Sequence, residues 1–600
     1  MTFSEPARTR IQRWVAILAM TAAYVHCVAI SWGKWGDLLI DAPWDLDDAR
    51  TLMQPGSQLY VSFLYPYGPL IPYVNMLLFK LFGSNSWVLF YSGLTAAALM
   101  TAILYRTARL FIGRLGATIA AVAFPYICGF AKLTPNGSFN WAMSYRSCAQ
   151  YGSLLAAAST FFLLRHALKK KPLDFWLSVL FLALAGLSKI ESLTAATAPH
   201  LAFIVLALWA RTFNWKLHLA GYAASLALFF GVFGYFYSIA GQSLFADNLF
   251  QLAFHPVYKL FALKTMGADN WPVSFTQLAI SLAYLAAACL LPIILARFVE
   301  APNGTSNQPL RILSLIAGVC AALLFWTENL ESTFRFVPFL AAAIILQQLW
   351  VGIKSKDQRA TLIPMALLWT FVIGSLTRSL FRTVSYHYGF YLLPPALPAL
   401  AVFFFRVMPG WWPSRPSFKI ISAYTCVGMF TGLILIHLQY SAPAYAERTA
   451  EIRTPRGSML IAKEQIMMYE GERVRVPTGE YFQEIVAFLS ALPKDTRVMV
   501  VPHGEAGLTY FCDLKNYYKD YISCVPTEKG RYDDAEFLTV VQAQPPDYII
   551  RIALDLSEYN YTSFGQSYSK KTWAWLQPQY DIFKIYGPRY IVVLKRKATK

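Results

Sequence analysis

Charged residues are scarce in this sequence. Only 14% of its 600 residues are Asp, Glu, Lys or Arg, whereas 56% are hydrophobic; a soluble globular domain carries about 25% charged residues. Uncharged apolar runs recur along most of the length, and a helix that spans a bilayer needs about 20 such residues. The scarcity of charge excludes a soluble globular protein over most of the chain and predicts a polytopic α-helical membrane protein.

Acidic residues are fewer than basic ones, 33 against 52. The imbalance lies in residues 1–439, which hold 31 basic and 14 acidic residues, whereas residues 440–600 hold 21 and 19. A basic excess beside apolar runs is typical of the charges that orient membrane helices. We therefore expect these basic residues to contact membrane lipids, and we expect no nucleic acid partner.

Cysteine is also sparse, and the eight cysteines form no CxxC pair and no cluster with histidine. The common structural zinc motifs are therefore absent from the sequence. Cys512 and Cys524 both fall in the polar C-terminal part. They would form a disulfide if that part lies in an oxidising compartment, and would otherwise remain reduced.

Thirteen apolar runs are candidate membrane spans. Arg8, Arg10 and Arg13 precede the first run and no small-residue cleavage site follows it, so we expect an uncleaved first span. The sequence predicts a transmembrane domain over residues 1–439, with an external loop at about 32–71, and a soluble domain over 440–600. The candidate spans are 14–31, 86–107, 114–131, 149–166, 174–190, 191–210, 217–240, 275–299, 311–327, 333–353, 361–380, 388–408 and 419–438.

The charges of the loops predict the orientation. One set of alternate loops, counted with the N-terminus, holds 20 of the 31 basic residues of the membrane part. Because Lys and Arg are enriched on the cytoplasmic side, this set and the N-terminus are expected in the cytoplasm. An odd number of spans then places residues 440–600 in the periplasm or outside the cell. A bacterial inner (plasma) membrane is the expected location.

The C-terminal part reads as a small α/β domain. Residues 497–502, 546–552 and 589–596 are strand-like runs rich in β-branched residues. Residues 480–493 have the apolar spacing of a helix that ends at a proline. Because no phosphate-binding glycine loop or nucleophile elbow occurs in this part, a supporting or acceptor-recognising role is favoured over a second active site.

Four aspartates crowd the stretch DAPWDLDDAR, residues 41–50, in the first external loop. One or two of them could cap a short external helix that starts at Asp47 and Asp48, because acidic groups stabilise a helix N-terminus. Alternatively, a carboxylate there could act as a general base for glycosyl transfer, with Arg50 holding a phosphate or orienting the base. Asp47 and Asp48 could also bind a divalent cation, the one cofactor that this cluster allows.

The sequence resembles the GT-C glycosyltransferases, a superfamily that includes protein O-mannosyltransferases and the bacterial enzymes that add aminoarabinose to lipid A. The resemblance is carried by DDAR at 47–50, by LYVSFLYPYGPLIPYVN from residue 59, and by later segments that include GLSKIES and SYHYGFYLLP. It implies an enzyme that takes a sugar from a polyprenyl phosphate on the external face, typically with inversion, and a first-loop aspartate as base. Asp47 matches that aspartate, Asp48 its acidic neighbour, and Arg50 the basic residue of the motif.

This chain departs from some of these relatives at Tyr67-Gly68-Pro69-Leu70, where they carry KPPL. The lysine that could bind the donor phosphate is thus absent, and another cation must replace it. Arg378, Arg382 and His387 lie at the expected outer membrane boundary and are the candidates. Their alternative role is to reach lipid headgroups or to end a helix.

Further residues are candidates for supporting roles. Lys189 and Glu191 lie in a turn between two predicted spans, where they either serve function or form a structural ion pair. Arg146 is a weaker candidate in the second external loop. Among the aromatic residues of the external loops, only Tyr67 is expected near the site, since aromatic belts form at any membrane interface.

The favoured function is an integral-membrane glycosyltransferase that uses a polyprenyl-phosphate sugar and an extracytoplasmic lipid, glycan or protein acceptor. One alternative is a transporter or flippase for lipid-linked glycans, which would more often bury its ionisable residues near the middle of the membrane. A second alternative is a glycan polymerase or ligase, which would transfer a whole oligosaccharide.

Overall fold

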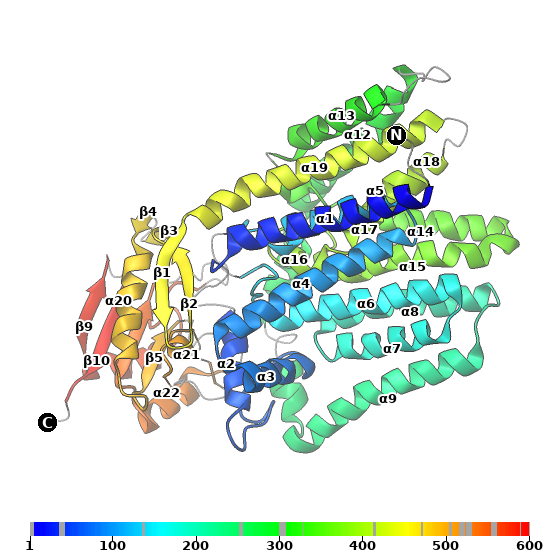
Figure 1. Cartoon of the computed structure of the whole chain (residues 1–600). Coiled ribbons are helices and arrows are strands. Elements are labelled where there is room, and N and C mark those ends of the chain that lie inside the picture. The colour runs from blue at the N-terminus through cyan, green and yellow to red at the C-terminus, as the bar shows by residue number, and fades with distance from the viewer. Residues whose placement is uncertain are drawn as a thin grey trace.

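The structure is a computed structural model. It describes residues 5–34, 42–134, 138–250, 256–298, 308–327, 329–411, 416–469, 472–502, 507–514, 522–523, 531–553, 561–587 and 590–598. A bundle of long helices makes up most of the molecule, and a smaller domain of strands and short helices covers one end of it (Figure 1).

Ten helices in the described part of the chain are long and apolar enough to cross a membrane. Their outer faces carry exposed large hydrophobic side chains, as lipid-facing surfaces do. These helices are α1 (Glu5–Ser31), α4 (Ser86–Arg109), α6 (Ser147–Lys169), α8 (Ile190–Trp209), α9 (Trp215–Ala240), α12 (Trp271–Phe298), α13 (Gln308–Trp326), α14 (Val337–Lys354), α15 (Arg359–Leu376) and α19 (Pro416–Ala446).

Three of the thirteen predicted spans form shorter apolar helices. They are α5 (Arg114–Phe124) with its continuation η1 (Pro125–Gly129), α7 (Pro172–Gly186), and a broken helix made of α17 (Ala396–Val402), η6 (Phe403–Val407) and α18 (Met408–Gly410). Prolines account for two of the interruptions, since Pro125 lies at the α5–η1 junction and Pro394 and Pro395 separate α17 from the short α16 (Gly389–Leu392). The prediction of a polytopic helical membrane protein with a small C-terminal α/β domain is confirmed.

Small residues allow helices to approach closely inside the bundle. A Cβ atom on Gly318 of α13 would lie 2.3 Å from the carbonyl oxygen of Thr425 on α19, and one on Gly428 would lie 2.2 Å from that of Leu315. These two glycines therefore bring the backbones of α13 and α19 together, as small residues do in membrane helix pairs.

The N-terminus and the C-terminal domain lie at opposite ends of the bundle (Figure 1). The helices α2 (Ala42–Leu52) and α3 (Leu70–Phe82) lie at the end that carries the C-terminal domain. The segments η2 (Leu244–Leu249) and α11 (Pro256–Met266) form much of the long loop between α9 and α12. Of the first external loop, predicted over 32–71, the structure describes helix α2, an irregular segment after it and the start of α3.

The C-terminal domain begins where α19 ends at Ala446. Its main sheet has the order β5 (Val498–Val501), β8 (Tyr548–Ile552), β10 (Ile591–Arg596), β9 (Tyr580–Tyr586), with β5 and β8 parallel and the other neighbours antiparallel. Three strands and helix α20 (Thr478–Ser490) coincide with the predicted elements. The remaining elements are the hairpins β1 (Arg448–Thr454) with β2 (Gly457–Ala462) and β3 (Gln465–Tyr469) with β4 (Glu472–Val476), the short pair β6 (Ile522–Ser523) and β7 (Arg531–Tyr532), and the helices α21 (Gly507–Phe511), α22 (Asp534–Ala543) and α23 (Lys570–Leu576).

Cys512 is buried in the C-terminal domain. Cys524 lies outside the described residues, so the disulfide between them stays a prediction.

Candidate active site

The acidic stretch of the first loop forms helix α2. The helix begins at Ala42, with Asp45 in its first turn and Arg50 in its last turn, which are the positions where the helix dipole favours each charge. The helix was expected to start at Asp47 and Asp48, and this expectation was wrong. Because the helix starts five residues earlier, both aspartates lie inside it. The helical repeat therefore sets the direction of each carboxylate. Asp41 lies outside the described residues.

Helix α2 presents two acid–base pairings on different faces. Asp45 and Asp48 are three residues apart and share a face, and the guanidinium Nη1 of Arg146 donates to both, at 3.1 Å from Asp45 Oδ1 and 3.1 Å from Asp48 Oδ2. Asp47 and Arg50 are also three residues apart and form an ion pair with each other. Because the helical repeat directs Asp47 and its sequence neighbour Asp48 to different faces, the two aspartates pair with different arginines.

Asp45 has a second partner, because its Oδ2 accepts a hydrogen bond from the backbone N–H of Ser147, the first residue of α6. A capping role was one of the alternatives for the aspartates of this stretch. Asp45 caps the N-terminus of α6, a helix that starts about one hundred residues later, as well as lying in the first turn of its own helix.

Arg146 is buried, with 7% of its side chain exposed. Its guanidinium carbon lies 5.1 Å from the ring centroid of Trp44 and 5.9 Å from that of Tyr67. A buried arginine requires paired charge and hydrogen bonds, which Asp45 and Asp48 supply. The structure thus places this residue, a weaker candidate from the sequence, in the centre of the acidic cluster.

The segment Tyr67-Gly68-Pro69-Leu70 docks on the turn between α7 and α8. The N–H of Gly68 donates to the carbonyl of Ser188 at 3.1 Å, and the N–H of Leu70 donates to that of Leu187 at 3.0 Å. A Cβ atom on Gly68 would lie 2.1 Å from the carbonyl oxygen of Leu187, so this backbone approach requires glycine.

This docking brings Tyr67 against Lys189, whose side chain is fully buried. The Nζ of Lys189 donates to the hydroxyl of Tyr145 and lies 3.4 Å from that of Tyr391. It lies 4.9–5.8 Å from the ring centroids of four tyrosines, an arrangement that stabilises a cation. These four are Tyr67, Tyr145, Tyr388 and Tyr391. Burial raises the pKa of Tyr67 and Tyr145 well above the ordinary tyrosine value, so both remain neutral.

Glu191 links Lys189 to Arg378. Its Oε1 lies 3.7 Å from Lys189 Nζ and forms an ion pair with Arg378 Nη1. The Arg378 guanidinium also lies over the ring of Tyr388, 4.1 Å from its centroid. Lys189, Glu191 and Arg378 therefore form one charged group beside Tyr67, and Tyr67 also contacts Arg146.

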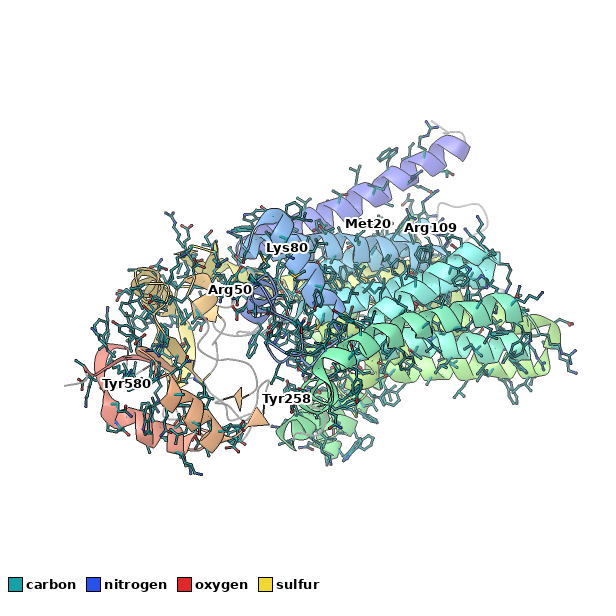
Figure 2. The ribbon with its side chains drawn as sticks, turned by 90° about the horizontal axis from the view of Figure 1, so that it is seen from below. Met20, Arg50, Lys80, Arg109, Tyr258 and Tyr580 are labelled. Carbon is teal, nitrogen blue, oxygen red and sulfur yellow. The ribbon has the colours of Figure 1, made fainter. Side chains whose placement is uncertain are left out.

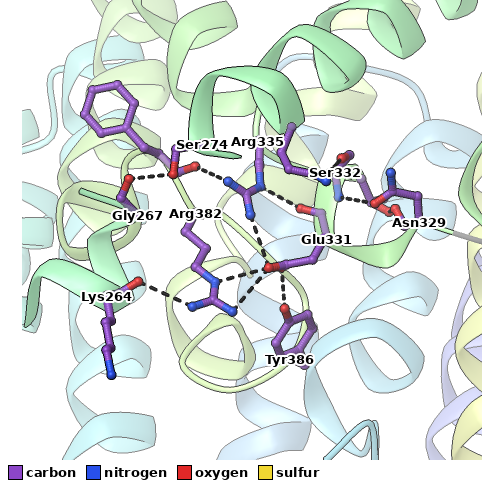
Figure 3. Close-up of polar contacts among 12 residues, drawn as sticks. Lys264, Gly267, Ser274, Asn329, Glu331, Ser332, Arg335, Arg382 and Tyr386 are labelled. Atoms are coloured by element: carbon purple, nitrogen blue, oxygen red, sulfur yellow. Dashed lines mark hydrogen bonds and ion pairs between the residues drawn. The ribbon is translucent and has the colours of Figure 1, made fainter. Parts of the chain in front are cut away.

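Arg382 lies in a different cluster, drawn in Figure 3. Glu331 accepts from Arg335 Nη2 at 3.2 Å, from Arg382 Nε at 3.2 Å and from the hydroxyl of Tyr386. Arg335 also donates to the carbonyl of Phe381 at 2.8 Å. The structure thus separates Arg382 from Arg378, although the two were grouped by sequence.

His387 packs among aromatic rings, with 4.5 Å between its ring centroid and that of Phe139 and 4.0 Å to that of Tyr388. Burial, helped by the nearby Arg378 and Arg382, lowers the pKa of His387 to about 3. At neutral pH it is a neutral hydrogen-bonding group and not a cation.

Several residues of these clusters were not singled out from the sequence. Arg335 lies inside the predicted span 333–353, and an ionisable residue in a span is a signal that could have found it. Tyr145 and Tyr388 are aromatic residues of external loops, a pattern too common to single them out. The other residues not singled out are Tyr391, Glu331 and, in the C-terminal domain, Tyr510 and Leu514.

A divalent cation was one expected use of Asp47 and Asp48. Among the residues that the structure describes, no group of three or more His, Cys, Asp or Glu side chains is placed to hold a metal ion. Arg50 and Arg146 each bind one oxygen of these two carboxylates, so a metal ion would compete with a guanidinium group at each.

Comparison with known proteins gives one family match. Residues 66–235 match the model of the dolichyl-phosphate-mannose-protein mannosyltransferase family. The matched segment starts beside Tyr67 and includes Arg146, Lys189 and Glu191, whereas α2 precedes it. The chain is a membrane glycosyltransferase, and its match to this family covers 170 of its 600 residues. No curated protein sequence matches this chain.

Two solved structures illustrate what this chain is similar to. ArnT from Cupriavidus metallidurans bound to undecaprenyl phosphate is 11% identical, with 99% of this chain and 99% of that chain covered and a TM-score of 0.43. The archaeal oligosaccharyltransferase AglB from Archaeoglobus fulgidus, in complex with an inhibitory peptide and a dolichol-phosphate, is 12% identical. The alignment covers 98% of this chain and 74% of AglB, with a TM-score of 0.43.

Proposed function

We propose that this glycosyltransferase transfers a sugar from a polyprenyl-phosphate donor to a hydroxyl group of an acceptor, with inversion at the anomeric carbon. The observation that carries the proposal is a series of contacts that runs from Asp48 of α2 through Arg146 and Tyr67 to the charged group of Lys189, Glu191 and Arg378. The family model also names a dolichyl-phosphate sugar as donor. The reaction occurs on the face that carries the C-terminal domain, outside the cytoplasm of a bacterial plasma membrane.

Asp47 is the proposed base. Its carboxylate accepts the proton of the acceptor hydroxyl while the acceptor oxygen forms a bond to the anomeric carbon. The bond between that carbon and the phosphate oxygen breaks, and its electron pair leaves with the polyprenyl phosphate. Arg50 is already bound to Asp47, so it orients the carboxylate. Asp48, bound to Arg146, supports the same helix face on which Asp45 lies.

The leaving phosphate gains one negative charge as a diester becomes a monoester. Cations placed beside it therefore bind the transition state more tightly than the donor, which lowers the barrier. Arg378 and Lys189 are the proposed phosphate ligands, because both lie in the tyrosine-lined group beside Tyr67. Lys189 would supply the cation that the Tyr67-Gly68-Pro69-Leu70 segment lacks.

Arg382 and His387 follow Arg378 on the same loop. We propose that they contact the lipid-linked phosphate from that loop, with the neutral His387 as a hydrogen-bond donor. The acceptor is an extracytoplasmic lipid, glycan or protein.

The test uses the purified full-length protein with a labelled polyprenyl-phosphate sugar, and it follows both release of polyprenyl phosphate and transfer of label to the acceptor. Asp47→Asn should lower turnover by at least about 100-fold, since general base catalysis contributes about 10²–10⁴-fold. Asp174→Asn is the matched control. Asp174 is also a buried aspartate paired with an arginine, at 3.1 Å from Arg165, but it lies on α7 near the other end of the bundle.

Wild-type turnover from Asp47→Asn would contradict the assignment of the base. Movement of the lipid across a vesicle membrane without bond cleavage would favour a transporter. Transfer of a preassembled oligosaccharide in place of a single sugar would favour a ligase or polymerase.

A further inference from the structure

The C-terminal domain touches helix α2 at Arg50. The guanidinium Nη1 of Arg50 donates to the carbonyl of Leu514 at 3.1 Å, and its guanidinium carbon lies 5.2 Å from the ring centroid of Tyr510. Figure 2 shows Arg50 at the junction of the helical bundle and the C-terminal domain. The contact joins residues that are more than 450 positions apart in the sequence.

The part of the C-terminal domain that contacts Arg50 is held in place by other contacts. Tyr510 lies on α21 and is fully buried. Arg456, from the turn between β1 and β2, lies 5.5 Å from the centroid of the same ring and pairs with Asp513. Arg456 also donates to the carbonyl of Ser84 at 3.1 Å. The segment 510–514 is therefore fastened to the bundle beside α2, and it does not contact Arg50 alone.

Arg50 connects this segment to the acidic helix. One guanidinium nitrogen, Nη1, donates to Leu514, and the other, Nη2, forms the ion pair with Asp47. Because the guanidinium group is planar and rigid, fixing one of its edges fixes the direction of the other.

We infer that Tyr510 and the carbonyl of Leu514 are positioning elements of the active site, which hold Arg50 and through it the carboxylate of Asp47. The inference rests on the proposed function, since it assigns the C-terminal domain a part in the geometry of the proposed base. Tyr510 does not touch the substrate in this scheme. It acts through Arg50.

A double-mutant cycle on turnover tests this inference. Tyr510→Leu should lower kcat about tenfold and change the KM for the donor less than twofold, because a misdirected base slows the chemical step. Tyr510→Phe keeps the ring face and should restore kcat to within about twofold of the wild type. In an Arg50→Met background, Tyr510→Leu should have no further effect on kcat.

Tyr568→Leu is the control for loss of a buried tyrosine in the same domain. Tyr568 is 2% exposed and packs against Tyr561 and Phe564, so its loss should lower thermal stability and leave kcat per folded enzyme unchanged in both backgrounds. The inference would be overturned if Tyr510→Leu lowered kcat by the same factor in the wild-type and Arg50→Met backgrounds. It would also be overturned if Tyr510→Leu left kcat unchanged.

The same cycle measured on the thermal unfolding midpoint needs no substrate. Coupling of Tyr510 and Arg50 is expected there as well, and additive changes in the midpoint would overturn the inference. Absence of polyprenyl phosphate release by the wild type would instead contradict the proposed function, so the two failures are distinguishable.

Discussion

The backbone N–H of Gly68 donates a hydrogen bond to the carbonyl of Ser188, with 3.1 Å between nitrogen and oxygen. This bond sets the first external loop on the turn that precedes α8, and as a result the Tyr67 ring centroid lies 5.0 Å from Lys189 Nζ. Two segments more than one hundred residues apart thus form one wall of the candidate site through a main-chain contact.

Gly68→Ala tests this contact. The added Cβ would lie 2.1 Å from the carbonyl oxygen of Leu187, so the loop must move away and Tyr67 must leave Lys189. We expect turnover to fall at least about tenfold, because displacements near 1 Å in a site cost up to about 100-fold. Gly113→Ala is the matched control, since a Cβ there meets no atom within 4 Å and the backbone has a negative φ of −64°. Equal turnover of the two variants would contradict the prediction.

Arg146→Met should destabilise the protein by about 3–5 kcal/mol, because removal of one partner leaves buried carboxylates without their counter-charge. Asp45 and Asp48 both lose the guanidinium group that binds them at 3.1 Å. The measurement is the thermal unfolding midpoint of the full-length protein. Arg165→Met is the comparison, because Arg165 also binds an aspartate at 3.1 Å but is 26% exposed against 7% for Arg146. A larger loss from Arg165→Met would show that burial is not the cause.

His387 predicts a pH dependence of stability. Its pKa is lowered to about 3 in the folded protein, whereas a histidine in an unfolded chain titrates near 6.5. Between about pH 3 and 6.5 the unfolded chain therefore binds more protons, so this residue makes stability fall as the pH falls below about 6.5. His387→Asn removes the effect and keeps a residue that tolerates the positive φ of 51°.

The thermal unfolding midpoint should accordingly drop less between pH 7.5 and pH 5 in His387→Asn than in the wild type. His26→Asn, at an exposed position, controls for removal of a histidine. The same drop in His387→Asn as in the wild type would mean that His387 is not buried as the structure has it.

Arg335 and Arg382 bind the same carboxylate oxygen of Glu331, each at 3.2 Å, but their exposure differs (Figure 3). The side chain of Arg335 is 2% exposed and that of Arg382 is 38% exposed. We expect Arg335→Gln to cost about 3 kcal/mol and Arg382→Gln about 1 kcal/mol or less, because exposed ion pairs are screened by solvent. If Arg382 binds the donor, Arg382→Gln should instead raise the KM for the donor. If the two variants differ in stability but Arg382→Gln leaves the KM for the donor unchanged, Arg382 has only a structural role.

The membrane part of the fold could be predicted because apolar run length and the side preference of Lys and Arg are local properties of the chain. The predicted spans 114–131 and 388–408 met this criterion by hydropathy, yet the helices there are short or broken. Prolines at 125, 394 and 395 interrupt them, and a hydropathy average does not register a proline. Strands such as β10 could be predicted from β-branched runs, but not their order in the sheet.

The candidate site could be predicted only where its contacts are local. Asp47 and Arg50 lie three residues apart in sequence, so their pairing follows from the helix that contains them. Arg146 is about one hundred residues from Asp45 and Asp48, and nothing in the sequence connects them. Glu331 and Arg382 are likewise distant in sequence, and they meet because the segment before α14 and the segment after α15 lie beside each other.

The pairing of Asp47 with Arg50 fixes the carboxylate of the proposed base before any substrate binds. On the proposed chemistry, the phosphate binds at Arg378 and Lys189, so Arg50 stays with Asp47 while the donor is bound. Donor and acceptor can therefore be captured independently, because the cation that orients the proposed base and the cations that hold the phosphate are separate groups. Because the acidic and basic side chains of the site already pair with one another, capture of the donor depends on a close fit in the site. It depends little on long-range electrostatic attraction.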